Sequence, residues 1–102
     1  MKLPDHRHPC FVIGVVAQLV KMHPQTLRYY EKLGLIQPAR TDGGIRLFSM
    51  HDVERLHKVQ ELQEAGVNPT GIKLILELSD KVEKLESELN ELRQKKKAAM
   101  SL

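Results

Sequence analysis

Apolar residues recur at helical spacing in several stretches of the chain, and helix-ending residues separate the first two stretches. Residues 15–20 are largely apolar and predict a short helix that Gly14 opens. A second helix is predicted to begin at Pro24, because proline lacks the N–H that would have no intrahelical partner there. This helix runs through Leu33 and stops at Gly34, which can take the left-handed conformation that closes helices.

Capping residues mark two further helices. Ser49 and Asp52 have the spacing of a capping box, with Asp in place of the usual Glu, and predict the start of a third helix that ends at Gly66. Asn68 is then placed to cap, and Pro69 to open, a fourth helix. The apolar positions of these two helices are Val53, Leu56, Val59, Leu62, Ile72, Ile75 and Leu76.

The segment between the second and third helices predicts a small β-hairpin over residues 40–48. Asp42 and Gly43 supply the positive φ angles of a tight turn. Residues 11–13 and residues 35–38 are predicted to be extended. The hairpin would therefore form a wing beside the second helix.

The C-terminal third carries a narrow apolar stripe. From Ile75 onward the apolar residues are separated by 3, 4, 3, 4 and 3 positions, which matches the a/d seam of a coiled coil. The residues predicted to make a dimer contact are Leu78, Val82, Leu85, Leu89 and Leu92. A single helix cannot bury so narrow a stripe, so a homodimer is expected; the alternative is a helix folded back onto its own domain. The sequence leaves open whether this helix continues the fourth one, because Ser79 and Asp80 could begin a new helix.

Length and charge narrow the class of protein. The 102 residues, of which 41% are apolar, suffice for one small domain. The net charge of +3 is uneven, because residues 1–50 carry +4 and residues 51–102 carry −1. The positive potential is therefore expected on the N-terminal half.

Cysteine usage and hydropathy predict the compartment. Cys10 is the only cysteine, which excludes an intramolecular disulfide. No apolar run approaches the roughly 20 residues that span a bilayer, and the first eight residues lack the apolar stretch of a signal peptide. We expect a soluble, cytoplasmic protein.

One face of the second helix has a composition typical of DNA readers. Gln25, Arg28, Tyr29 and Lys32 lie at i, i+3, i+4 and i+7, so they share a face. Gln and Arg can bond base edges in the major groove, whereas Tyr and Lys can bind phosphate. Two short helices joined by a tight break, the second presenting this face, predict a helix-turn-helix, although a mixed polar face is often just solvated.

The predicted wing strengthens this interpretation. It carries Arg40 and Arg46, which could reach the DNA backbone beside the second helix. Phosphate contact is the favoured role of both arginines, and the alternative is that each is simply an exposed strand residue. Together these features predict a mostly α-helical chain with a winged helix-turn-helix head, a small hairpin wing and a C-terminal coiled-coil helix.

A family resemblance covers residues 11–78. Residues 26–40, TLRYYEKLGLIQPAR, followed by residues 44–48, GIRLF, resemble the signature of MerR-type transcriptional regulators. Within that family, residues 22–28, MHPQTLR, and residues 66–72, GVNPTGI, are similar to the heat-shock repressor branch, HspR. The resemblance places the DNA-binding head at 11–78. The polar residues 1–10, interrupted by Pro4 and Pro9, are predicted to form a flexible arm, and residues 79–102 a dimerisation helix with a basic tail.

The resemblance also implies partners and residue roles. It implies a dimer that is joined by an antiparallel coiled coil and binds an inverted-repeat operator. For the HspR branch it further implies repression of chaperone genes, with a DnaK-type chaperone as co-repressor. Arg28, Tyr29 and Arg46 match the family's DNA-contact motif, and Gln25 and Thr26 match the heat-shock branch. The chain departs from many members in two places, since Lys21 replaces a turn glycine and His23 replaces a capping serine, which predicts a strained turn and a weaker cap.

Other classes of function are less well supported by the sequence. His6, His8 and Cys10 alternate along the arm and could hold a metal, but a disordered arm is the better interpretation. Ser49, His51 and Asp52 are crowded at a helix start, so they indicate capping rather than a catalytic triad. No enzyme activity, metal or cofactor is expected. The remaining alternatives are a MerR-type activator that distorts promoter DNA and a coiled-coil adaptor that binds protein.

Overall fold

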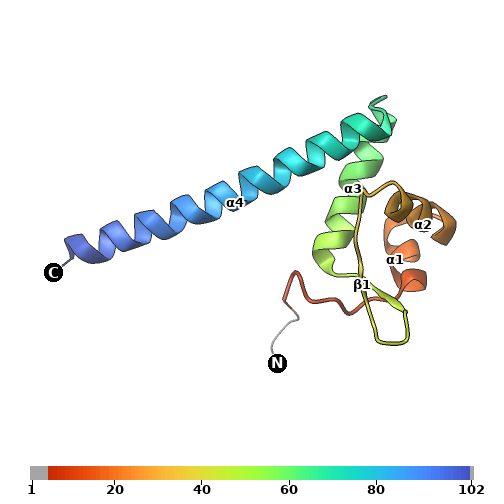
Figure 1. Cartoon of the computed structure of the whole chain (residues 1–102), viewed down its shortest axis with the longest axis horizontal. Helices are drawn as coiled ribbons and strands as arrows, with labels where there is room; N and C mark the ends of the chain where they lie inside the picture. Colours follow the sequence, from red (N-terminus) through yellow and green to blue (C-terminus); the bar gives the residue numbers. More distant parts are fainter. Residues whose placement is uncertain (1–4, 102) are drawn as a thin grey trace.

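The computed structural model describes residues 5–101 and is mostly helical, as predicted. Its elements, in chain order, are α1 (Ile13–Val20), α2 (Pro24–Lys32), β1 (Ala39–Arg40), β2 (Arg46–Leu47), α3 (Met50–Glu64) and α4 (Pro69–Met100). The first three helices gather into a head, with the hairpin at its edge, and α4 extends far away from this head (Figure 1). The molecule is therefore elongated, with principal extents of 56 × 37 × 23 Å.

The head encloses one apolar core. Helix α1 packs against α2 and α3, and α3 packs against the first turns of α4. The buried apolar residues are Val16, Ala17, Val20, Leu27, Tyr30, Leu35, Ile36, Phe48, Val53, Leu56, Val59, Ile72 and Leu76. Burial of these side chains is the main force that holds the short helices together, because helices of eight or nine residues are marginal alone.

The predicted helix ends are confirmed by their hydrogen bonds. In the capping box, Asp52 N–H donates to Ser49 Oγ at 3.1 Å, and Ser49 N–H donates to Asp52 Oδ2 at 2.9 Å. Asn68 caps α4 by accepting a bond from Gly71 N–H at 2.8 Å, and Pro69 occupies the first turn. Ser49 is thus used as a helix cap, which is the predicted interpretation of the Ser49, His51 and Asp52 cluster.

Helix α1 begins at Ile13, earlier than predicted, and Gly14 lies inside its first turn. The predicted extended segment 11–13 is therefore shorter than expected. Phe11 pairs with Phe48 through two backbone hydrogen bonds of 2.9 and 2.7 Å. This bridge holds the backbone extended only through Val12, whose carbonyl oxygen accepts the first bonds of the helix from Val15 and Val16.

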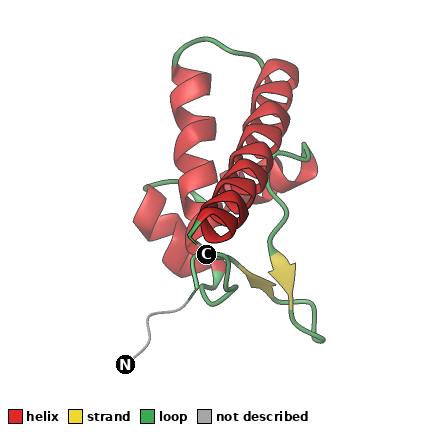
Figure 2. Ribbon diagram, turned by 90° about the vertical axis from the view of Figure 1, so that its left-hand side faces the viewer, coloured by secondary structure: helices red, strands yellow, loops and turns green. Residues whose placement is uncertain are grey.

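The hairpin wing has the predicted antiparallel form, but the positive φ of its turn lies at Gly44 (φ 85°) and not at Asp42 or Gly43. Strands β1 and β2 pair Ala39 with Leu47 and Arg40 with Arg46. Figure 2 shows the two strands and their connecting loop projecting from the helical head. The regular strands are only two residues long each, so the wing needs side-chain contacts with α2 to be held in place.

Helix α4 is continuous from Pro69 to Met100, which settles the question left open by the sequence. Ser79 and Asp80 lie within it, and the Asp80 carboxylate pairs with Arg55 of α3 instead of capping a new helix. The boundary predicted at residue 78 therefore falls inside one helix. No helix among residues 5–101 combines the length and the apolar content needed to cross a membrane.

Candidate nucleic-acid interface

The turn between α1 and α2 sets the direction of α2. Lys21 ends α1 in the left-handed conformation, with φ 55° and ψ 47°, and its N–H donates to the carbonyl oxygen of Ala17. His23 then caps α2, because its Nδ1 accepts a hydrogen bond from Gln25 N–H at 3.0 Å. The turn is therefore strained at a non-glycine residue, and the histidine takes the capping role that serine or asparagine more often fills.

Helix α2 presents its predicted polar face to solvent. Gln25, Arg28, Tyr29 and Lys32 are all exposed, and Tyr29 retains 53% of its accessible surface. Thr26 is half-buried at the edge of this face. The exposed row is about two turns long and is free of the packing contacts that fix the opposite side of the helix.

The opposite side of α2 anchors it to the head. Leu27 and Tyr30 are buried, and the Tyr30 hydroxyl donates a hydrogen bond to Gln63 Oε1 of α3. Burial raises the pKa of Tyr30 above its usual value of 10.0, and the neighbouring Tyr29 adds to this rise. The neutral phenol is thus the favoured form in the folded protein, and it fixes the orientation of the exposed row.

The two wing arginines are held against α2 by one carboxylate. Arg46 Nε donates to Glu31 Oε1 at 2.9 Å, and Arg40 Nη2 donates to the same oxygen at 3.1 Å. Arg40 also donates to the carbonyl oxygen of Gly44, at 3.0 Å, inside the hairpin loop. Both arginines therefore lie at the junction of wing and helix, and their contact with DNA phosphate stays a prediction.

Glu31 is the functional residue that the sequence analysis missed. It is the only acidic residue of α2 and lies in the basic half of the chain, and these two facts were the available signal. Its side chain is partly buried, with 21% exposed, whereas most carboxylates lie in water. The two arginines outnumber this single acid, so the junction remains positive.

The residues predicted for dimerisation lie on α4, away from the α2 face. Their side chains are exposed in the single chain, from 47% for Leu89 to 62% for Leu85 and Leu92. Leu78 and Val82, together with Ile75, line an apolar groove along the helix. Large apolar side chains in a continuous exposed row are typical of surfaces that another helix covers.

The alternative metal site lacks the required geometry. His6 pairs with Glu54 of α3, with 2.8 Å between Nε2 and Oε2, rather than with the other two candidates on the arm. Within residues 5–101, no group of three or more His, Cys, Asp or Glu side chains is arranged to hold a metal ion.

Comparison with known proteins gives one consistent result. A family model described as the MerR HTH family regulatory protein matches residues 11–79. A Streptomyces coelicolor protein provisionally named heat shock protein HspR is 49% identical over 85 residues, which are 82% of this chain and 56% of that protein. The HTH-type transcriptional regulator GlnR of Bacillus anthracis is 41% identical over 76 residues, which are 74% of this chain and 59% of that protein.

A solved structure extends the likeness to the fold. HiNmlR, a MerR family regulator lacking the sensor domain, bound to promoter DNA, superposes with a TM-score of 0.64 at 25% identity. The match covers 89% of this chain and 73% of that one. The chain spans only 56 to 59% of the length of the two sequence relatives.

Proposed function

Because the chain belongs to the MerR family of HTH regulatory proteins, we propose that it is a DNA-binding transcriptional regulator, most simply a homodimeric repressor of heat-shock genes. The observation that carries this proposal is the exposed polar row of α2 beside a positively charged wing. A row of this kind, held rigidly from behind by buried residues, is what a reading helix needs in order to enter a major groove.

The proposed contacts divide into base readers and phosphate binders. The residues proposed to contact DNA are Gln25, Thr26, Arg28, Tyr29, Lys32, Arg40 and Arg46. Gln25 and Arg28 lie toward the start and middle of α2, where side chains of a reading helix reach base edges. Lys32 and the wing arginines supply charge for the backbone on either side.

A dimer would explain both the seam and the proposed operator. The seam of α4 would pair with the same seam of a second copy, most simply as an antiparallel coiled coil with a head at each end. A two-fold dimer binds best to an inverted repeat, because each half-site then meets an identical reading helix.

The heat-shock assignment is supported by the Streptomyces coelicolor relative. It is also supported by residues 22–28 and 66–72, which are similar to the heat-shock repressor branch. We propose that the chain acts by binding alone, without catalysis, on genomic DNA in the cytoplasm. A DnaK-type chaperone is proposed as co-repressor, and adding such a chaperone should tighten operator binding. The operator itself would come from sequencing the genomic fragments that the full chain retains.

The decisive experiment measures the affinity of the full chain for such a fragment by fluorescence anisotropy over a range of salt concentrations. A DNA-binding head predicts a steep linear fall of log affinity with log salt, because phosphate contacts release counterions. Arg28→Ala should weaken binding by about 1 to 3 kcal/mol, whereas Arg93→Ala, which removes the same charge from the exposed end of α4, should not. A flat salt dependence would instead support a protein-binding adaptor.

A further inference from the structure

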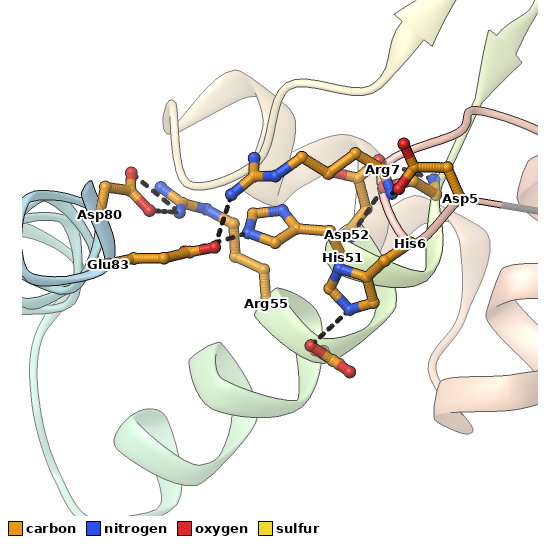
Figure 3. Close-up of polar contacts among 10 residues, drawn as sticks. Asp5, His6, Arg7, His51, Asp52, Arg55, Asp80 and Glu83 are labelled. Atoms are coloured by element: carbon orange, nitrogen blue, oxygen red, sulfur yellow. Dashed lines mark hydrogen bonds and ion pairs between the residues drawn. The ribbon is translucent and has the colours of Figure 1, made fainter. Parts of the chain in front are cut away.

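The described part of the N-terminal arm is fastened to the start of α3. His51 N–H donates to the carbonyl oxygen of His6 at 2.9 Å, and Cys10 N–H donates to the carbonyl oxygen of Phe48 at 3.0 Å. The ring of His6 also packs edge-on against the ring of His51, with 5.5 Å between their centroids. These contacts fix the backbone of residues 6–10 on the head. The backbone position of Arg7, which lies between them, is therefore fixed as well (Figure 3).

The side chain of Arg7 reaches from the arm to α4. Its Nη2 donates to Glu83 Oε1 at 2.7 Å, a contact between residues 76 positions apart in the chain. The other oxygen of Glu83 lies 3.8 Å from Nε2 of His51. The hydrogen bond from Arg7 lowers the pKa of Glu83 below its usual value of 4.5, so the carboxylate is charged at neutral pH. Figure 3 shows Arg7 and His51 converging on Glu83.

Glu83 extends the contact of α4 with the head beyond its apolar part. Ile72 and Leu76 are buried in the head, but every described residue from Glu77 onward is exposed. On the same side, Asp80 receives Arg55 Nη1 at 2.9 Å, and Arg55 Nε donates to the carbonyl oxygen of Leu35 at 2.8 Å. Among the described ion pairs between α4 and the rest of the chain, the one with Glu83 is the farthest along the helix.

Because of this position, the contact controls the angle at which the long α4 leaves the head. From Leu76 to Leu92, the last seam residue, α4 rises roughly 24 Å at about 1.5 Å per residue. A tilt of about 10° at Leu76 would therefore move Leu92 by roughly 4 Å. In a dimer joined along the seam, the same tilt changes the separation of the two heads, whereas half-sites require reading helices about 34 Å apart.

We propose that Arg7 is a positioning residue that, through Glu83, fixes the angle between the head and α4 and so sets the spacing of the two reading helices. This inference rests on the proposed homodimer but not on the identity of the operator. The pair is exposed, with 60% and 54% of the two side chains in solvent, so its role is to select one angle rather than to stabilise the fold.

The test measures the distance between the two heads in the absence of DNA. Cys10→Ser with Gln18→Cys places one spin label on the exposed face of α1 in each subunit of the full chain. Double electron–electron resonance should then give one narrow inter-subunit distance. Arg7→Ala should broaden the distance distribution or shift its maximum by roughly 4 Å, which is the displacement that a tilt of about 10° produces.

Four further variants make the result specific. Glu83→Gln should reproduce the change, and the double variant Arg7→Ala with Glu83→Gln should add nothing to it, because each single substitution already removes the Arg7–Glu83 ion pair. Arg7→Lys, which keeps the charge, should restore the narrow distance. Lys58→Ala is the matched control, since it removes one charge and an exposed ion pair with Glu61 on α3, and it should leave the distance unchanged.

The outcomes separate this proposal from the dimer itself. A dipolar signal whose distance is the same in the parent protein, Arg7→Ala and Glu83→Gln overturns the positioning role and leaves the dimer intact. Absence of any inter-subunit signal overturns the dimer, and the positioning role with it. Thermal unfolding should give Arg7→Ala the same midpoint as Lys58→Ala, and a much lower midpoint would assign Arg7 to stability instead.

Discussion

The guanidinium of Arg46 and the carboxylate of Glu31 join the wing to α2, with 2.9 Å between Nε and Oε1. Both side chains are three-quarters or more shielded from solvent, which makes this pair stronger than an exposed one. Arg40 binds the same carboxylate, so one acid orients both wing arginines. The reading helix and the wing therefore form one unit, and neither should meet DNA independently of the other.

Glu31→Gln tests whether this orientation matters more than charge. Removing an acid beside phosphates should by itself strengthen binding to any duplex. Loosening the wing should weaken binding to the operator, because its arginines are no longer pre-oriented. We expect the ratio of operator affinity to random-duplex affinity to fall about tenfold, or roughly 1.4 kcal/mol, in paired anisotropy titrations.

Glu91→Gln provides the control for net charge, since Glu91 is exposed on α4 and the substitution makes the same charge change. That variant should leave the affinity ratio unchanged. Equal strengthening on both duplexes in Glu31→Gln would mean that the carboxylate acts only as a repulsive charge and does not orient the wing.

Local features of the fold were predictable from the sequence because they depend on neighbours in the chain. The capping box of Ser49 and Asp52 and the cap at Asn68 each join residues three apart, and the sequence shows this spacing directly. The polar face of α2 follows from helical periodicity in the same way. The start of α1 was missed because it depends on Phe11 pairing with Phe48, which is distant in sequence.

The contacts that orient the candidate site were not predictable for the same reason. Glu31 meets Arg46 across 15 positions, and Arg7 meets Glu83 across 76. Charged side chains of both signs occur throughout the chain, so charge alone does not select these partners. The continuity of α4 at Ser79 was undecidable because a serine followed by an aspartate suits a helix start as well as a solvated helix surface.

Leu85→Asp should dissociate the proposed dimer. Leu85 is at the centre of the exposed seam, and a carboxylate there would have to be desolvated against a second helix. Sedimentation velocity should show monomers, and operator binding should weaken strongly because only one head can be engaged at a time. Ser87→Asp adds the same charge two residues away, on the face of α4 opposite the seam, and should leave a dimer. Dimers in both variants would place the contact elsewhere.

Lys21→Gly should stabilise the protein. Lys21 has φ 55°, a conformation that costs an L-residue about 1 to 2 kcal/mol, whereas glycine adopts it without this cost. The extra freedom of glycine in the unfolded chain offsets about 0.5 to 1 kcal/mol, so we expect a gain of roughly 0.5 to 1 kcal/mol in urea unfolding. Gly66→Ala is the reverse control, because Gly66 has φ 90° with open space around it, and it should destabilise.

Tyr30 predicts a loss of stability in alkali. Burial raises its pKa in the folded state above the value of 10.0 expected in the unfolded chain. The folded state therefore holds the phenolic proton more tightly, so this contribution is fully present below pH 10 and is lost as the pH rises through the folded-state pKa. The unfolding free energy should accordingly decline as the pH rises above about 10.

Tyr30→Phe isolates this contribution from the titration of lysines in the same range. The variant loses the bond to Gln63 and should be about 1 kcal/mol less stable than the parent at pH 8. It has no phenolic proton to lose, so the stability difference between the two proteins should shrink as the pH rises above 10. Urea unfolding from pH 8 to 11 measures this difference, with Tyr29→Phe, whose ring is exposed, as the matched variant that keeps most of the alkaline decline. A difference that stays constant across the range would mean that burial of Tyr30 does not favour its neutral form.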